Sequence, residues 1–238
     1  MREKRDIENK IKARFYEKEV TEMIEYNKIE TVFKRSMDGS KKLLQGEFRN
    51  PTVEYLKNNI WQFSEKIDGT NIRVYWDGHE VTFGGRTDRA QIPAPLINYL
   101  ISVFKNDKAE QVFEEKFGET SVIIFGEGYG GKIQNGGDYR SDVSFIVFDV
   151  LICGNYQPRS SVEDIAKSFG VDVVPLIFEG TLDDGINFVK KHPDSTIGHA
   201  KMEGLVARPK IEMRDRSGER VIVKIKWSDF KEFAEVEQ

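Results

Sequence analysis

The stretch WQFSEKIDGTNIRVYWDG, residues 61–78, places one lysine in a run that alternates apolar and polar residues like a β-strand. Lys66 has two acidic neighbours, Glu65 and Asp68, and Gly69 follows at once. In a strand, Lys66 and Asp68 point to one face, and a glycine lets a ligand approach the backbone. An uncharged lysine amine is a nucleophile, and burial or nearby cations lower its pKa toward that state. The stretch therefore predicts a nucleophilic Lys66, with an exposed strand lysine as the alternative.

Two further motifs offer cations for a phosphate. Arg86 follows two glycines at the end of the next predicted strand, where a guanidinium can bind a phosphate through two hydrogen bonds. Lys224 and Lys226 lie two residues apart in VIVKIKW, so both amines project from one strand face. Such ammonium groups repel each other unless an anion, such as a triphosphate, lies between them. The structural alternatives are a hairpin-end arginine and an edge strand with its lysines in solvent.

The stretch IIFGEGYGGKIQNGGDY, residues 123–139, contains the spacing G-x-G-x-x-G after a predicted strand. A dinucleotide site needs a helix next, and KIQNGGDY is a poor helix start, so we reject that reading. Glu127, a carboxylate between glycines at a strand end, suits a hard cation or a ribose hydroxyl. The alternative is a glycine-rich turn with an incidental acid.

The stretch FIVFD, residues 145–149, follows a second buried strand pattern. Strand alternation places Phe145 and Asp149 on one face and Phe148 on the other. An aromatic side chain on the ligand side can stack on a base. The alternative is that both phenylalanines belong to the core.

The elements that must position these residues follow from periodicity, turn residues and caps. We expect helices at 5–28, 94–105, 108–117, 160–169 and 181–191, and strands at 61–76, 79–84, 120–126, 143–152, 171–178, 203–209 and 220–226. Asp77-Gly78 predicts a hairpin turn, a capping box should start the helix at Ser160, Gly170 should end it, and Thr181 should cap the next helix. Strands and helices mix without regular alternation, so we expect an α+β fold of mostly antiparallel sheets.

Composition bounds the class of protein. The chain has 238 residues, 39% hydrophobic and 32% charged, as in ordinary globular proteins. One cysteine and three scattered histidines exclude a disulfide framework and make a structural zinc site improbable. No apolar run approaches about 18 residues, and the first twenty residues are too charged for a signal peptide, so we expect no membrane contact and a cytoplasmic location.

Charge is distributed unevenly along the chain, although the net charge is −4. Residues 196–226 carry eight Lys/Arg against four Asp/Glu, and residues 1–50 carry thirteen against ten. A locally basic face on an acidic protein can hold a polyanion at one place, and solvated surface charge is the alternative. The segment IETVFKRS, residues 29–36, either lines the path of such a polyanion or connects a packed helix to the rest.

Six motifs, EKIDGTN, GGR, FGEGYGGKIQ, FIVFDV, EGLVARP and VIVKIKWSDF, occur in an order and approximate spacing that resemble the covalent nucleotidyltransferase superfamily of ligases and RNA-capping enzymes. The details look most like the ATP-dependent RNA ligases of the bacteriophages' second class, which include the RNA-editing ligases. The resemblance covers residues 61–230. It implies an ATP-grasp-like nucleotidyltransferase (adenylation) domain that joins RNA 3′-hydroxyl and 5′-phosphate ends, at nicks or breaks, with ATP and Mg²⁺ or Mn²⁺.

The resemblance also implies residue roles. Lys66 would form a lysyl-AMP, Lys224 and Lys226 would hold the α-phosphate, and Arg86 would contact phosphate or the RNA terminus. Nucleotide binding would use Glu65 beside the adenine, Glu127 on the ribose and Phe148 on the base, with Ile67 and Asn71 close by. Glu203 would help place the metal, with Glu127 and Asp149 as further candidate ligands.

Three alternatives stay open. The first is a DNA ligase or a capping-type guanylyltransferase; relatives of both kinds carry an OB-fold domain after the last lysine motif, and we expect none here. The second is a nucleotide- or RNA-end-binding module without turnover, against which the set of Lys66, Glu203, Lys224 and Lys226 counts. The third concerns organisation: residues 1–60 would pack on a catalytic domain of residues 61–238, either as a whole minimal ligase or as a fragment that needs a partner. No motif points to a particular protein partner.

Overall fold

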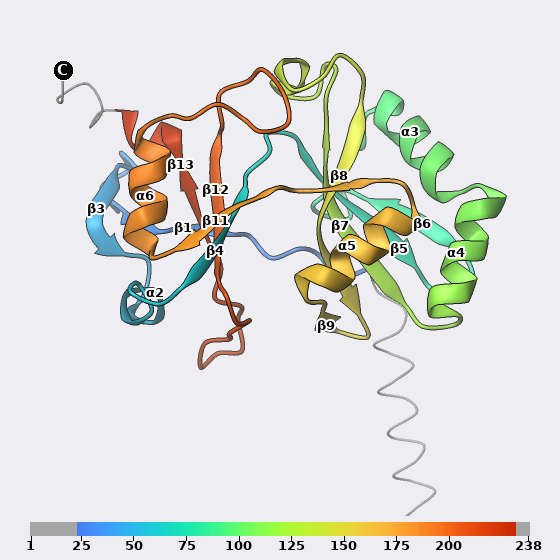
Figure 1. Ribbon diagram of the computed structural model, residues 1–238, viewed down its shortest axis with the longest axis horizontal. Coiled ribbons are helices and arrows are strands. Elements are labelled where there is room, and N and C mark those ends of the chain that lie inside the picture. Colours follow the sequence, from blue (N-terminus) through green and yellow to red (C-terminus); the bar gives the residue numbers. More distant parts are fainter. Residues whose placement is uncertain (1–22, 232–238) are drawn as a thin grey trace, which may run out of the picture. The chain divides into compact units, whose positions relative to one another are not determined.

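The computed structural model describes residues 23–231, which form two compact units (Figure 1). Unit 1 holds residues 23–26, Gly69–Gln134 and Asp142–Val173. Unit 2 holds Asn27–Asp68, Asn135–Ser141 and residues 174–231. The chain passes from unit 2 to unit 1 between Asp68 and Gly69, directly after the motif that carries Lys66.

Unit 1 is built on a six-stranded sheet with the order β10-β8-β7-β5-β6, and β9 pairs with β8. Its strands are β5 (Thr70–Trp76), β6 (Val81–Gly84), β7 (Val122–Tyr129), β8 (Ser144–Ile152), β9 (Asn155–Tyr156) and β10 (Asp172–Val173). All pairs are antiparallel except β8 with β10. The predicted hairpin around Asp77-Gly78 is confirmed as β5–β6.

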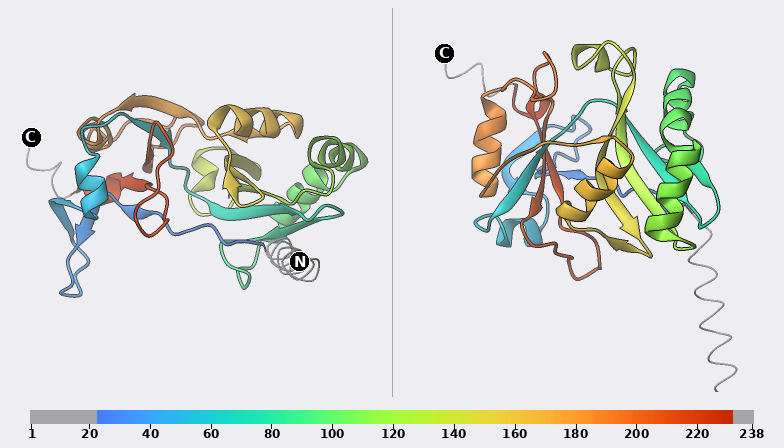
Figure 2. Two further views of the ribbon diagram at one scale, coloured as in Figure 1. Left: turned by 90° about the horizontal axis from the view of Figure 1, so that it is seen from below. Right: turned by 45° about the vertical axis from the view of Figure 1, so that its right-hand side comes forward.

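Three helices cover one face of this sheet: α3 (Ala94–Phe104), α4 (Asp107–Phe117) and α5 (Arg159–Ser168). Their apolar sides meet alternate residues of the strands, among them Ile72, Ile124 and Phe145, in one buried cluster. Residues 23–26 run along the opposite face (Figure 2, left), where Tyr26 packs on Phe125. That opposite face holds the polar residues of the unit that we consider below.

Alternation breaks in β8 at a β-bulge. Phe125 of β7 pairs with Asp149, but the next residue, Gly126, pairs with Val147, so Phe148 is the extra residue. A bulge shifts every later residue to the other face. Phe145 therefore lies in the helix-covered core, whereas Asp149 lies on the open face with Phe125. The prediction that Phe145 and Asp149 share a face was wrong, because strict alternation cannot anticipate the bulge.

Unit 2 contains a five-stranded sheet with the order β1-β13-β12-β4-β11 and a two-stranded sheet β2-β3. The strands are β1 (Glu30–Thr31), β2 (Phe33–Arg35), β3 (Leu43–Phe48), β4 (Trp61–Glu65), β11 (Leu176–Gly180), β12 (Gly204–Pro209) and β13 (Val223–Lys226), and the α-helices are α2 (Pro51–Tyr55) and α6 (Leu182–Lys190). Helix α6 begins with the predicted Thr181 cap in a complete capping box. Its apolar side packs against Phe63, Leu205 and Ile225 in the core of the unit.

Several predicted elements differ from the structure. The predicted strand 61–76 is two strands, β4 and β5, in different sheets, because residues 66–69 leave the extended conformation. The predicted strand 171–178 likewise splits into β10 and β11. Helix α5 starts after Pro158 without a side-chain cap, so the predicted capping box was wrong, whereas the stop at Gly170 is confirmed by its φ of +67°.

The structure tests only part of what we expected for the N-terminal residues. Most of the predicted helix 5–28 lies outside the described residues, and residues 23–28 are not helical. Residues 27–60 belong to unit 2 together with β4, and the assignment of residues 1–60 as a separate segment stays a prediction. No helix in residues 23–231 is long and apolar enough to span a membrane.

Candidate active site

The carboxylate of Glu203 joins two of the predicted lysines in unit 2. Lys66 follows β4 directly, and its backbone N–H donates to the carbonyl of Gly204, 2.9 Å away. The Lys66 Nζ lies 2.6 Å from Oε2 of Glu203, and the Lys226 Nζ lies 2.7 Å from Oε1. A Cβ at position 204 would overlap the carbonyl oxygen of Ile225, so only glycine lets β12 start this close to β13.

Lys224 lies on the same strand face as Lys226, as predicted. Val223 and Ile225 are buried in the core, and the two lysines between and after them point away from it. Lys224 is half-buried, and desolvation lowers the pKa of its ammonium group, with the charges of Lys66 and Lys226 lowering it further. The region is thus positively charged beyond what Glu203 neutralises, and it suits an anion.

Glu65 anchors a distant loop. Its side chain is 1% exposed, and its carboxylate accepts hydrogen bonds from the Ser195 hydroxyl (2.5 Å), the Thr196 hydroxyl (2.6 Å) and the Thr196 backbone N–H (3.0 Å). These contacts fix the end of β4, just before Lys66, to the loop that leads into Glu203. Ile67, on the other side of Lys66, is 3% exposed in unit 2. The predicted contacts of Glu65 and Ile67 with a nucleotide stay predictions.

The turn after Lys66 is held by segment 135–141. Asn135 donates from Nδ2 to Oδ2 of Asp68 at 2.7 Å, and the Asp68 backbone N–H donates to the Tyr139 hydroxyl at 3.4 Å. Burial, together with the charges of Glu203, Glu65 and Asp68, raises the pKa of Tyr139 to about 12 despite that backbone hydrogen bond. Tyr139 therefore stays protonated at any working pH. Lys66 and Asp68 thus do not share a regular strand, contrary to the expectation from alternation.

The predicted ribose- and base-binding residues gather on the open face of unit 1. Asn71 of β5 pairs with Glu127 of β7, so their side chains are cross-strand neighbours. The Asn71 Oδ1 is buried without a hydrogen-bond partner. On the neighbouring strand the ring of Phe148 is half-buried, in edge contact with Tyr26 at 4.9 Å between centroids, and the Tyr26 hydroxyl donates to Asp149 at 2.7 Å.

The sequence reasoning missed Arg73, which positions the loop that carries Arg86. Arg73 is fully buried and donates to the Gly85 carbonyl (2.7 Å), the Met23 carbonyl (2.8 Å) and Oδ1 of Asp88 (2.7 Å). The side chain of Arg86 itself is exposed. An arginine in an otherwise apolar strand was the available signal, because a buried guanidinium must have several acceptors.

The predicted metal ligands are not gathered into one cluster. Within residues 23–231, no group of three or more His, Cys, Asp or Glu side chains is arranged to hold a metal ion. The Glu203 carboxylate is engaged by two lysines, and Asp149 accepts from Tyr26. A magnesium ion commonly uses only one or two carboxylates and takes its other ligands from water and substrate phosphates, and Glu203 fits that pattern.

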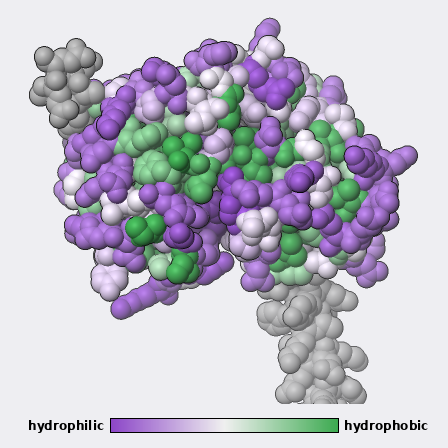
Figure 3. Space-filling model, in the orientation of Figure 1, coloured by the Kyte–Doolittle hydropathy of each residue, from purple (hydrophilic) through white to green (hydrophobic). Residues whose placement is uncertain are grey.

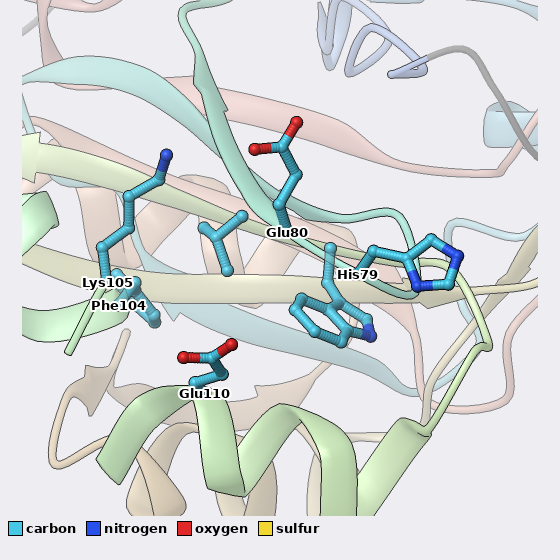
Figure 4. A pocket seen from close by; sticks show the side chains of 7 residues that line it. His79, Glu80, Phe104, Lys105 and Glu110 are labelled. Carbon is cyan, nitrogen blue, oxygen red and sulfur yellow. The ribbon is translucent and has the colours of Figure 1, made fainter. Parts of the chain in front are cut away.

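Two cavities deserve comparison. One, of about 370 Å³, lies entirely in unit 2, beside Glu203 and Lys226; we call it the Trp227 cavity. The other, of about 180 Å³, lies in unit 1 between the β5–β6 turn and helices α3 and α4 (Figure 4). Its apolar floor of Trp76, Val81 and Phe104 is ringed by His79, Glu80, Lys105 and Glu110. It contains no predicted site residue, so the chemistry points to the Trp227 cavity.

The surface shown in Figure 3 is largely hydrophilic, with hydrophobic side chains in small groups.

The fold resembles those of solved RNA ligases. Structures of Naegleria gruberi RNA ligase match at 18% identity: an apo mutant with a TM-score of 0.62, the enzyme with PPi at 0.61, and a mutant with ATP and Mn at 0.59. The matches cover 90%, 90% and 78% of this chain, but only 57%, 58% and 54% of those ligases. The α+β nucleotidyltransferase fold expected from the sequence is thus confirmed. Residues 59–226 match the sequence pattern of the RNA ligase family, and the chain belongs to that family.

Proposed function

We propose that the protein is an ATP-dependent RNA ligase that works through a lysyl-AMP intermediate. The observation that carries the proposal is the arrangement of Lys66, Glu203 and Lys226, with Lys224 beside them, inside the region that matches the RNA ligase family. A nucleophilic amine within a set of fixed cations is what transfer of a nucleotidyl group requires, since such reactions depend mainly on positioning and charge neutralisation.

The reaction has three steps. Lys66 loses its ammonium proton to solvent, and the uncharged Nζ attacks the α-phosphorus of ATP. A P–N bond forms, Nζ releases a second proton, the bond to the β-phosphate oxygen breaks, and diphosphate leaves. An oxygen of an RNA 5′-phosphate then attacks the same phosphorus, and the P–N bond breaks as Nζ takes up a proton and leaves as the amine of Lys66. An RNA 3′-hydroxyl finally attacks the activated 5′-phosphate, loses its proton and expels AMP. Lys224 and Lys226 neutralise the negative charge that develops on the phosphoryl oxygens.

The remaining residues take supporting roles. Glu127 binds the ribose hydroxyls, Phe148 stacks on the adenine, and Asn71 supplies its buried, unpartnered Oδ1 as an acceptor. Arg86, on the loop that Arg73 holds, contacts a phosphate or the RNA terminus. Glu65 fixes the strand that leads to Lys66. We retain contacts of Glu65 and Ile67 with the nucleotide as part of the proposal.

A divalent cation, Mg²⁺ or Mn²⁺, fits beside Glu203. The Naegleria ligase has been solved with ATP and Mn, and a single carboxylate plus phosphate oxygens makes an ordinary magnesium site. When bound, the ion would supply charge neutralisation at the phosphate oxygens. Glu127 and Asp149 stay further candidates as ligands.

We further propose a place within the family and a substrate. The motifs favour the bacteriophage second-class and RNA-editing branch, nicked duplex or broken single strands as substrates, and a cytoplasmic location. The protein's own residues would contact mostly backbone and strand ends, so we expect little base specificity.

Incubation with α-labelled ATP and magnesium tests the proposal. We expect a labelled protein whose adenylyl group lies on Lys66, located by mass spectrometry in residues 65–73, and no label in Lys66→Ala. Label from GTP alone would favour a capping enzyme, and absence of label would favour a binding module. Nicked RNA, nicked DNA and mixed duplexes then separate an RNA ligase from a DNA ligase.

A further inference from the structure

The proposed reaction uses Glu203 and Lys226 at one side of the Trp227 cavity, but it places no ligand against the rest of the lining. The cavity wall contains Glu203 and Lys226. The other lining residues that matter here are Asp68, Asp138, His192, Lys201, Trp227 and Lys231. A volume of about 370 Å³ lies within the range of about 300–1,000 Å³ that small-ligand pockets occupy.

An aromatic pair is the most unusual part of this lining. The rings of His192 and Trp227 stack with 4.2 Å between centroids and 10° between planes. His192 directly follows the C-cap Lys191 of helix α6 and has a φ of +48°, in the left-handed region where glycine is the usual residue. A histidine there carries a backbone cost that glycine would avoid, and such costs concentrate at ligand sites. Stacking on Trp227 is a contact that a glycine at this position could not make.

The charges of the cavity favour one phosphate rather than several. Lys231 and Lys201, which pairs with Asp194 at 2.7 Å, are exposed cations in its lining, and Asp68 and Asp138 are acids in the same lining. The inner pair, Lys226 and Glu203, largely neutralise each other at 2.7 Å. A triphosphate or diphosphate, with several negative charges, would meet both acids, whereas the single phosphate of a nucleotide at a strand end brings only one or two charges.

We propose that the Trp227 cavity binds one nucleotide at the end of an RNA strand, with the base on the His192–Trp227 ring pair and its phosphate near Lys201 and Lys231. Aromatic rings interleaved with cations are the usual means of holding single-stranded nucleic acid, and stacking tolerates any base. The identity of the strand as RNA rests on the proposed function. The position beside Glu203 and Lys226 would place that strand end next to the lysine that carries AMP.

Tryptophan fluorescence gives a direct test, because the chain has three tryptophans and two of them, Trp61 and Trp76, are 0% and 2% exposed. The probe is a 5′-phosphorylated single-stranded RNA hexamer, added without ATP to the full-length protein. We expect saturable quenching that Trp227→Phe abolishes. His192→Ala and His192→Gly should weaken the affinity equally, by about tenfold, because both remove the ring and only glycine relieves the backbone.

Lys201 offers a matched comparison. Its side chain is 56% exposed and pairs with Asp194 at 2.7 Å, and Lys210 is 56% exposed and pairs with Glu179 at 2.7 Å. We expect Lys201→Ala to weaken hexamer binding several-fold and to reduce its salt dependence by about one phosphate contact, and Lys210→Ala to change neither. If His192→Gly binds the hexamer more tightly than His192→Ala, position 192 matters for the backbone of the turn and not for its ring. That result would overturn the proposal.

Two other results would also overturn it: no saturable quenching by the hexamer, or displacement of the hexamer by inorganic diphosphate at equal concentration, which would mark a diphosphate site. The measurement needs no ATP, so its failure is distinct from failure of the proposed function. Quenching by the hexamer without AMP on Lys66 would contradict the ligase proposal and support strand binding in the Trp227 cavity. AMP on Lys66 without quenching would support the ligase proposal and contradict strand binding in the cavity.

Discussion

The Lys66 Nζ lies 2.6 Å from the Glu203 carboxylate, and the side chains are only 24% and 17% exposed. The same carboxylate holds Lys226 at 2.7 Å through its second oxygen. One acid thus keeps two ammonium groups close together at a partly buried place, where their mutual repulsion is poorly screened. Glu203 thus fixes the positions of both Lys66 and Lys226.

Removal of that carboxylate charge should disable the site. We expect Glu203→Gln to lower the rate of AMP transfer to Lys66 by about 100-fold, because two ammonium groups lose the acid that holds them in place. The measurement is label incorporation from α-labelled ATP at saturating magnesium.

Glu212→Gln is the matched control, since Glu212 also forms a 2.6 Å ion pair, with Arg220, but outside the lysine cluster. It should incorporate label at the normal rate. Equal rates for Glu203→Gln and the unmodified protein would contradict the positioning role of Glu203.

The lowered pKa of Lys224 predicts a specific dependence of stability on pH. Desolvation is the main cause, followed by the charges of Lys66 and Lys226, so the folded protein loses the Lys224 proton at a lower pH than the unfolded chain, whose lysines titrate near 10.5. Between those two pKa values the unfolded state binds more protons, and stability must rise with pH. The cost of charging Lys224 is fully present below the folded pKa.

Urea unfolding at pH 8 and pH 10 measures this effect. We expect Lys224→Met to have a higher free energy of unfolding than the unmodified protein at pH 8. This difference should become smaller at pH 10, where the folded unmodified protein carries less of the Lys224 charge. A difference between the two proteins that is constant over this range would show that the Lys224 pKa is not lowered.

The buried carboxylate of Glu65 should matter mainly for folding. Glu65→Ala removes three hydrogen bonds to one buried carboxyl group and leaves the Ser195 and Thr196 donors without their acceptor. We expect the free energy of unfolding to fall by about 3 kcal/mol, since a hydrogen bond to a charged group contributes about 1.5–3 kcal/mol. Ser195→Ala removes one of these three hydrogen bonds and should lower the free energy of unfolding by about 1.5 kcal/mol. Denaturant unfolding of both variants measures these losses. A smaller loss for Glu65→Ala than for Ser195→Ala would show that Glu65 does not stabilise the loop at 195–196.

The local pattern of the sequence was sufficient to predict that Lys224 and Lys226 project from one face of their strand. Lys224 and Lys226 alternate with Val223 and Ile225, which are 1% and 0% exposed, and alternation alone places both amines on one side. The end of α5 at Gly170 and the cap of α6 at Thr181 were predictable for the same reason. Each of these signals involves residues within a few positions of one another.

The parts that escaped prediction depend on distant contacts. Glu65 takes its partners 130 and 131 positions along the chain, from a loop with no regular pattern. Asp149 lies on the other face than predicted because Phe148 forms a bulge opposite β7. Only the pairing of the two strands reveals this bulge. The buried position of Arg73 depends on the loop after β6 and on the segment at Met23, whose carbonyls accept hydrogen bonds from its guanidinium.

The unpartnered oxygen of Asn71 yields a prediction in which stability and function move in opposite directions. A buried acceptor without a donor costs about 1–3 kcal/mol, so Asn71→Ala should leave the free energy of unfolding unchanged or raise it by about 1 kcal/mol. If the oxygen receives a hydrogen bond from the nucleotide, as we propose, the same substitution should raise the ATP concentration for half-maximal AMP transfer by about tenfold. Thermal unfolding without ligand and label incorporation over a range of ATP concentrations measure the two quantities. Asn155→Ala, at an exposed asparagine in β9, is the control for both. A clear loss of stability with unchanged ATP dependence would show that Asn71 serves the fold and not the nucleotide.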